Sequence, residues 1–293
     1  MLRFLKQVQL AFARTLDHDQ FAVAKAAAYS AILTLFPSVI LISSILTASH
    51  STLSFIREIT YAIGGIMPAG TSSSLLTFFE GRKPAPVRMI ITTSVITLWT
   101  GSGVMISCMD GFRRAYQLPK TWNLTEERLV SFFLVFLAGI PLTFASFLLA
   151  FGRQIEHWMA FHANREYDLY ILVTWTFIRW LLAAATTVAV LALIYHHGLP
   201  RTQPWHRVVP GSVLATVLWF ASTTIFGWYL RHYADYGVIY GSVGTAIALL
   251  VWLYIVSLVI LIGAEFNAQR YPRYLFGSYS SIKQAEVNGK KEP

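Results

Sequence analysis

Residues 236–267 read YGVIYGSVGTAIALLVWLYIVSLVILIGAEFN, and this stretch decides the class of fold. No charged residue occurs between Asp235 and Glu265. A helix needs about 20 apolar residues to cross the hydrocarbon core of a bilayer. We therefore predict a membrane span over residues 236–266. Glu265 lies near the end of this span, where a carboxylate without a partner is costly.

Small residues recur at helical spacing in the first half of this span. Gly237, Gly241 and Thr245 follow one another at intervals of four, and so do Gly244 and Ala248. Small residues at this spacing let two membrane helices approach closely. We interpret Gly237, Gly241 and Gly244 as a helix-packing face. The alternative is that glycine and alanine are simply common in membrane helices.

The whole chain has the composition of a polytopic membrane protein. Of its 293 residues, 55% are hydrophobic and only 13% are charged, whereas an ordinary soluble protein has about 25% charged residues. The single cysteine, Cys108, excludes an intramolecular disulfide and leaves no thiol cluster for a metal. Composition therefore overrides the one or two soluble domains that the length alone suggests.

The predicted fold class is all-α, a bundle of six transmembrane helices with short interfacial helices. An amphipathic segment over residues 1–20 precedes a transmembrane domain over residues 21–270. The predicted spans cover residues 21–48, 87–109, 129–151, 169–195, 208–230 and 236–266. Residues 49–86 are expected to form one or two short helices against the bundle, and the tail over residues 271–293 to be partly disordered.

Lysine and arginine are distributed unevenly between the two sides of this topology. Of the 23, fifteen fall on the side of the N-terminus, seven fall on the other side, and Arg179 lies within a span. Because positive charges concentrate on the cytoplasmic side, both termini are predicted to be cytoplasmic. Topology thus explains the net charge of +9, and no nucleic-acid-binding motif accompanies it. The expected partners are the lipid bilayer and a small solute or ion, not nucleic acid, and the oligomeric state stays open.

Arg179 is the sharpest single candidate for a functional residue. It lies ten residues from the start of the span over 169–195, near the middle of the bilayer. Charges at this depth usually face the bundle interior or water, so Arg179 is a candidate contact for an anion or substrate, or half of an internal ion pair. The alternatives are that its side chain extends outward to the headgroups, or that the span starts later, near Leu181.

A second candidate site lies at the predicted cytoplasmic rim. Lys25 begins the first span, Asp110 ends the second, and Glu265 with Asn267 ends the sixth. These four residues are predicted to form a network that satisfies its own charges, because buried charges need partners. The alternative is a set of ordinary boundary charges that the lipid headgroups solvate.

Helix breakers interrupt three of the spans. Pro37, Pro141, Gly101 and Gly103 suggest discontinuous helices of the kind that expose backbone groups to substrate in transporters, although proline is also frequent in ordinary membrane helices. The histidine spacings do not match a helical metal pair, and no phosphate-binding loop or nucleophile elbow occurs. We therefore expect no metal, no cofactor and no enzymatic activity.

Three strings resemble the YihY/BrkB family of bacterial inner-membrane proteins, formerly called ribonuclease BN. They are AAAYSAILTLFP at 26–37, GSGVMISCMDGFRRAY at 101–116 and YGSVGTAIALLVWLYIVSLVILIGAEFNA at 240–268, in the family's order. The resemblance implies a six-helix protein of the inner membrane with cytoplasmic termini.

The leading hypothesis for function is a transporter or permease-like protein of unknown substrate. Its warrant is Arg179, the helix breakers and the closely packed last span. The alternative is a non-transporting envelope or structural protein whose polar residues only hold the bundle together. A third, a membrane-bound ribonuclease, rests on the family's old label alone.

Overall fold

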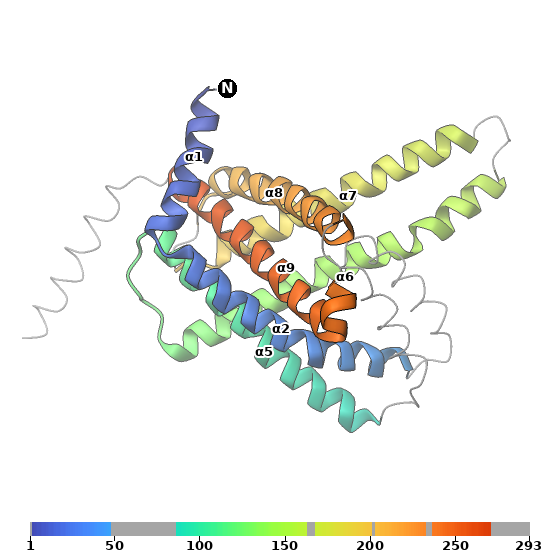
Figure 1. Ribbon diagram of the computed structural model, residues 1–293, viewed down its shortest axis with the longest axis horizontal. Coiled ribbons are helices and arrows are strands. Elements are labelled where there is room, and N and C mark those ends of the chain that lie inside the picture. Colours follow the sequence, from blue (N-terminus) through green and yellow to red (C-terminus); the bar gives the residue numbers. More distant parts are fainter. Residues whose placement is uncertain (1, 48–85, 163–167, 201–202, 233–235, 271–293) are drawn as a thin grey trace, which may run out of the picture.

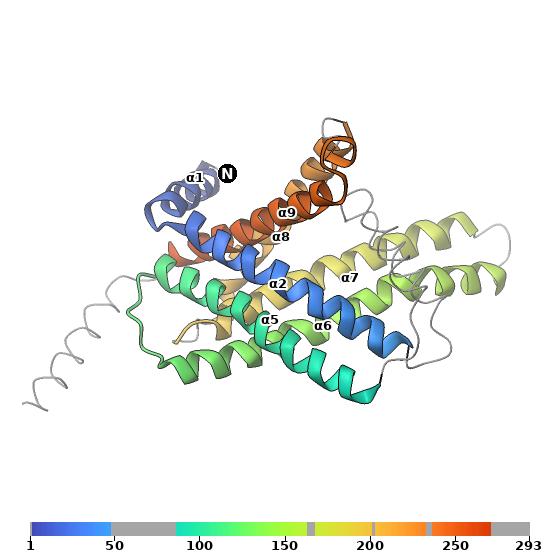
Figure 2. The same ribbon diagram turned by 60° about the horizontal axis from the view of Figure 1, so that its bottom comes forward.

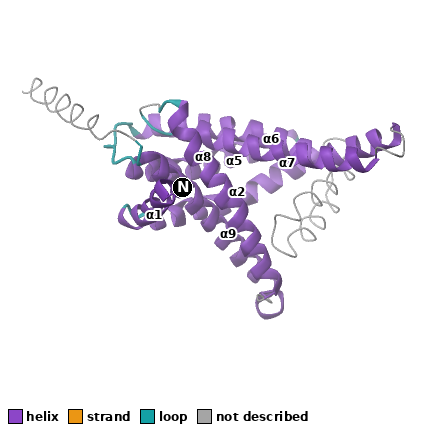
Figure 3. Cartoon of the chain, turned by 90° about the horizontal axis from the view of Figure 1, so that it is seen from above, coloured by secondary structure: helices purple, strands orange, loops and turns teal. Residues whose placement is uncertain are grey.

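The computed structural model describes residues 2–47, 86–162, 168–200, 203–232 and 236–270, and within these ranges it contains helices and no strand (Figures 1 and 3). Seven helices are described. They are α1 (Leu2–Asp17), α2 (Gln20–Thr47), α5 (Val87–Ala115), α6 (Leu124–His162), α7 (Asp168–His197), α8 (Trp205–His232) and α9 (Tyr236–Ala268). The prediction of an all-α protein is confirmed for this part of the chain.

Five of these helices, α2, α5, α7, α8 and α9, are long and apolar enough to cross a membrane. In each of them most of the span is not buried inside the protein, so apolar side chains cover the outer surface, as expected for contact with lipid. The remaining predicted span, over residues 129–151, lies in α6, and the side chains of residues 144–162 fall outside the described part. The short helices predicted over 49–86 and the tail over 271–293 also lie outside the described residues.

The helices pack in pairs that continue into one bundle (Figures 1 and 2). α2 lies along α5, α6 along α7, and α8 along α9. α9 also contacts α1, α2 and α5, so it connects elements from both halves of the chain. The pairing of α6 with α7 and of α8 with α9 follows from short connections between antiparallel neighbours.

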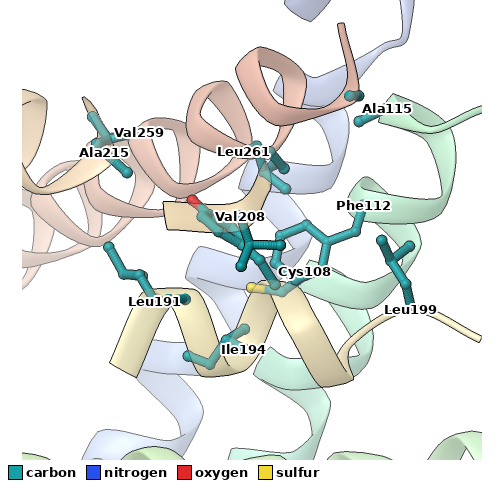
Figure 4. Close-up of a cluster of buried hydrophobic side chains, with 14 of the residues drawn as sticks. Cys108, Phe112, Ala115, Leu191, Ile194, Leu199, Val208, Ala215, Val259 and Leu261 are labelled. Carbon is teal, nitrogen blue, oxygen red and sulfur yellow. The ribbon is translucent and has the colours of Figure 1, made fainter. Parts of the chain in front are cut away.

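A large cluster of buried hydrophobic side chains lies at the end of the bundle that holds Glu265, which we call the Glu265 end. Figure 4 shows side chains from α5, α7, α8 and α9 meeting there. Phe112 and Tyr195 are fully buried and meet edge to face, with ring centroids 5.2 Å apart. Cys108 is buried in the same cluster as a free thiol. The helices therefore converge at this end and are held there by close contact.

α1 is docked on the bundle and does not stand alone. Its amphipathic sequence is as predicted, and Ala11 is fully buried in a cluster with Ile262 and Phe266 of α9. Phe12 and Leu16 remain exposed on the other side of the helix. α1 therefore uses one apolar face to contact α9 and presents a second to its surroundings.

The predicted helix breaks are not observed, which corrects that expectation. α2 continues through Pro37, α6 through Pro141, and α5 through Gly101 and Gly103. A proline removes one backbone donor, and a membrane helix can continue through it because neighbouring helices satisfy the backbone carbonyl that is freed. The two glycines face α2: a Cβ at either position would lie 3.4 Å from a side-chain atom of that helix. Their small size serves close packing of α5 on α2.

The predicted glycine face of the last span is described only in part. Gly244 and Ala248 are both buried, in a helix that packs along α8. The surroundings of Gly237 and Gly241 lie outside the described side chains, so their role in packing stays a prediction.

Candidate functional site

Glu265 is the centre of a buried polar cluster at the Glu265 end. Its side chain has 0% of its surface exposed. Its Oε1 accepts a hydrogen bond of 2.8 Å from Gln20 Nε2 and lies 2.8 Å from His18 Nδ1. Gln20, which is also fully buried, donates a second bond of 2.9 Å to the backbone oxygen of Gly111. The carboxylate thus joins α9 to α2 and to the turn between α1 and α2, and Gln20 extends the cluster to α5.

The local geometry explains why these side chains meet. A Cβ on Gly111 would collide with the end of the Leu261 side chain and lie 2.9 Å from Gln20 Oε1, so glycine leaves room for these side chains between α5 and its neighbours. His18 is placed by a turn in which Asp19 has a φ of 54°. This left-handed conformation ends α1 and redirects the chain into α2.

His18 also connects Glu265 to the surface. Its Nε2 lies 3.2 Å from Gln117 Nε2, and Gln117 sits in a second left-handed turn with a φ of 53°. If the Gln117 amide donates, His18 Nε2 accepts and Nδ1–H donates to the carboxylate, which is the neutral tautomer. A continuous chain of hydrogen bonds therefore leads from an exposed amide to a buried acid.

The cluster leaves two buried oxygens without a hydrogen-bond partner among the described residues. These are Glu265 Oε2 and Gln20 Oε1. A buried polar atom without a partner costs about 1–3 kcal/mol. The cluster is thus polar, tightly enclosed and incompletely satisfied.

Asn267 ties α9 to α8. Its Oδ1 accepts a hydrogen bond of 2.7 Å from the backbone N–H of Gly211, and its Nδ2 donates one of 2.9 Å to the Val208 carbonyl. A Cβ on Gly211 would collide with the Asn267 amide and with the Gly263 carbonyl. Glycine is therefore required where this amide contacts α8.

The remaining residues of the predicted rim network lie elsewhere. Lys25 is exposed and forms no ion pair with Asp110 or Glu265. Asp110 is bound by Arg113 and by Arg114, whose Nε lies 2.9 Å from its Oδ2. The structure therefore buries Glu265 and Asn267 with separate partners, Glu265 toward α2 and Asn267 toward α8, and leaves Lys25 and Asp110 outside both sets of contacts. Arg179 lies near the middle of α7 with a partly buried side chain.

A cleft of about 890 Å³ opens between α2, α5 and the start of α6. Arg128 lines it, and its Nη1 donates a hydrogen bond of 2.7 Å to the buried Ser102 hydroxyl. The Arg128 guanidinium also lies 4.4 Å from the centre of the Trp99 ring. In the described part of the chain it forms no ion pair with a carboxylate. Arg128 is therefore a positioned cation whose charge no described carboxylate neutralises.

The other charged groups of the cleft compensate one another. Lys120 Nζ lies 3.1 Å from Glu127 Oε2, and Arg114 pairs with Asp110. Ser102 precedes the end of the predicted span at residue 109 by seven residues, which is about 10 Å along a helix. Arg128 was assigned from sequence to a connector, so its reach to this depth was missed. No sequence spacing predicts the contact between Arg128 and Ser102, because the two residues lie on different helices.

The described ranges contain no group of three or more His, Cys, Asp or Glu side chains able to hold a metal ion. The long apolar helices and their exposed apolar surfaces define a multi-pass membrane protein.

The chain belongs to the Virulence factor BrkB family, whose model matches residues 11–280. It is 26% identical over 277 residues to the Putative ribonuclease-like protein YfkH of Bacillus subtilis, a match that covers 93% of this chain and 96% of that protein. It is 24% identical over 251 residues to a UPF0761 membrane protein of Pseudoalteromonas atlantica, covering 82% and 77% of the two chains.

A shorter match links it to a UPF0761 membrane protein of Tolumonas auensis, with 29% identity over 139 residues, which is 47% of this chain and 44% of that protein. No solved structure matches. The family resemblance predicted from the three strings is therefore confirmed.

Proposed function

We propose that this protein is a transporter or permease-like protein of the bacterial inner membrane, and that the Arg128 cleft is part of its substrate path. The proposal includes six spans, with residues 129–151 of α6 as the third, and both termini in the cytoplasm. Five long apolar helices and the excess of lysine and arginine on the side of the termini support this arrangement.

The observation that carries the proposal is the environment of Arg128. A structural arginine in a membrane protein normally pairs with an acid, because an unpaired charge is costly there. Arg128 instead has a neutral hydroxyl and an aromatic ring as partners and borders an open cleft. An arginine positioned in this way is suited to contact a substrate anion.

The alternative is a non-transporting envelope or structural protein, in which the polar clusters only hold the helices together. The Bacillus subtilis relative is named ribonuclease-like, which raises a third function for this chain. RNA degradation by the purified protein, free of trace nucleases, tests that function directly.

Flux through the purified protein in liposomes tests the proposal. A panel of inorganic and organic anions is screened with the wild type, with Arg128→Gln, and with Arg207→Gln as the matched control. Arg207 is a partly buried arginine on the same predicted side, outside the cleft lining. We expect flux for the wild type and the control, and a loss of about tenfold or more for Arg128→Gln, because a hydrogen bond to a charged group contributes about 1.5–3 kcal/mol. Equal flux in all three proteins contradicts the assignment of Arg128, and no flux at all favours the alternative.

A further inference from the structure

The charged side chains that line the cleft carry one more positive charge than negative charges. Lys120 pairs with Glu127, and Asp110 is bound by Arg114. Arg128 is the lining cation that these pairs do not include. A ligand that carries a single negative charge therefore neutralises the cleft, whereas a neutral ligand leaves the guanidinium unpaired.

The orientation of Arg128 selects the kind of anion. A guanidinium has five N–H donors in a flat fork, and one of them binds Ser102 Oγ. The Trp99 ring lies 4.4 Å from the guanidinium carbon and limits its rotation. The remaining donors are held in a plane beside an open space, a geometry that fits two oxygens of a phosphate or carboxylate.

The rest of the cleft is too apolar for a small hydrated anion alone. Its lining includes the apolar side chains Ala22, Val23, Ala26, Ile106, Leu129 and Phe132. Three lining side chains also extend onto the outside of the bundle, since Leu124 is 79% exposed, Leu129 is 62% exposed and Trp99 is 58% exposed. The cleft thus joins a charged inner end to an apolar outer surface, which matches an amphiphile.

We propose that the cleft binds an anionic phospholipid through its phosphodiester. The phosphate, with one negative charge, accepts hydrogen bonds from Arg128 beside Ser102, and the acyl chains lie along Leu129, Phe132 and the exposed edge of Trp99. The inference rests on the proposed function only for the membrane orientation, which places the cleft near the anionic cytoplasmic leaflet. Binding is measured without flux, so a failure to transport and a failure to bind are separate results.

Native mass spectrometry of the full-length protein in detergent tests the binding. Phosphatidylglycerol, which has a net charge of −1, and phosphatidylcholine, which is neutral, are titrated in parallel. We expect phosphatidylglycerol to bind the wild type and the Arg207→Gln control about tenfold or more tightly than phosphatidylcholine. Arg128→Gln abolishes this preference, and Arg128→Lys restores it in part, because lysine keeps the charge but not the flat fork. Equal retention of the two lipids by the wild type overturns the proposal.

Two further experiments use the wild-type protein alone. They show whether the bound phosphate belongs to a lipid or to a soluble anion. Inorganic phosphate or glycerol 3-phosphate that displaces phosphatidylglycerol at equal concentration shows a site for a soluble anion and overturns the lipid assignment. A phosphatidylglycerol with a photoreactive acyl chain is cross-linked to the wild type and its attachment site is mapped. Attachment to α6 near Leu129 and Phe132 supports the proposal, and attachment confined to other helices contradicts it.

Discussion

Replacing Asn267 by alanine tests whether polar side chains on α9 hold the Glu265 end together. The change removes the acceptor of the Gly211 N–H, whereas the Val208 carbonyl keeps the Ser212 hydroxyl at 2.9 Å. A buried donor that loses its acceptor costs about 1–3 kcal/mol. The space left by the amide adds about 0.5–1 kcal/mol at the usual cost per volume of cavity. We therefore expect Asn267→Ala to lower the free energy of unfolding by about 1.5–4 kcal/mol.

Ser257→Ala is the matched control. Ser257 is buried in the same helix, but its hydroxyl donates to Leu253 O of its own helix at 2.8 Å. Its loss leaves the other helices untouched, so we expect a decrease below about 1 kcal/mol. Unfolding in detergent micelles, followed by tryptophan fluorescence against denaturant or temperature, measures both. Equal stability of the two variants would refute the role assigned to the Asn267 amide.

Five other changes have defined expectations. Gly211→Ala forces a methyl group into the α9 backbone and should lower the free energy of unfolding by about 2–3 kcal/mol. At Gly139 a Cβ meets nothing within 4 Å, so Gly139→Ala should be neutral or stabilising by up to about 1 kcal/mol in the same unfolding assay. Tyr195→Phe removes the 2.6 Å bond to the α9 backbone and should cost about 1 kcal/mol; an unchanged midpoint contradicts this. Gln20→Leu removes two buried hydrogen bonds and should cost about 2–4 kcal/mol in that assay, so a fully stable variant argues against the cluster. Arg179→Ala should reduce solute flux in liposomes, and wild-type flux counts against its predicted substrate role.

The helices followed from the sequence because long apolar runs separated by charged connectors leave few alternatives in a bilayer. Glu265 and Asn267 were singled out because polar residues at the end of an apolar run need partners. Their partners were missed, since Gln20 lies 245 residues away along the chain and Gly211 lies 56 away. Contacts at such separations depend on how helices pack, which local patterns do not encode.

Two differences between prediction and structure have local causes that the sequence contains. Lys25 follows the buried Val23 and Ala24, and the helical turn places it on the opposite face, toward the surroundings. Arg113 and Arg114 follow Asp110 by three and four residues, the spacing at which side chains of one helix meet. The rim network was predicted from the positions of both residues near the ends of predicted spans. The side of the helix on which each residue lies predicts its contacts better.

Arg128 could not be recognised in the same way. The sequence places it at the end of a polar connector between two predicted spans, where arginine is common. Its depth depends on where α6 begins relative to α5, and its partner Ser102 lies in the middle of an apolar span. The three-dimensional arrangement therefore supplies the functional candidate that spacing did not.

The central claim is that Arg128 lies in a cleft open to the cytoplasmic side of the membrane. An Arg128→Cys substitution in a Cys108→Ala background gives one thiol at this position, since the chain has no other cysteine. A small, negatively charged, membrane-impermeant thiol reagent is then added to inside-out and to right-side-out vesicles. The account predicts fast labelling of inside-out vesicles and none of right-side-out vesicles. Labelling only from the opposite side, or from neither side, would contradict it.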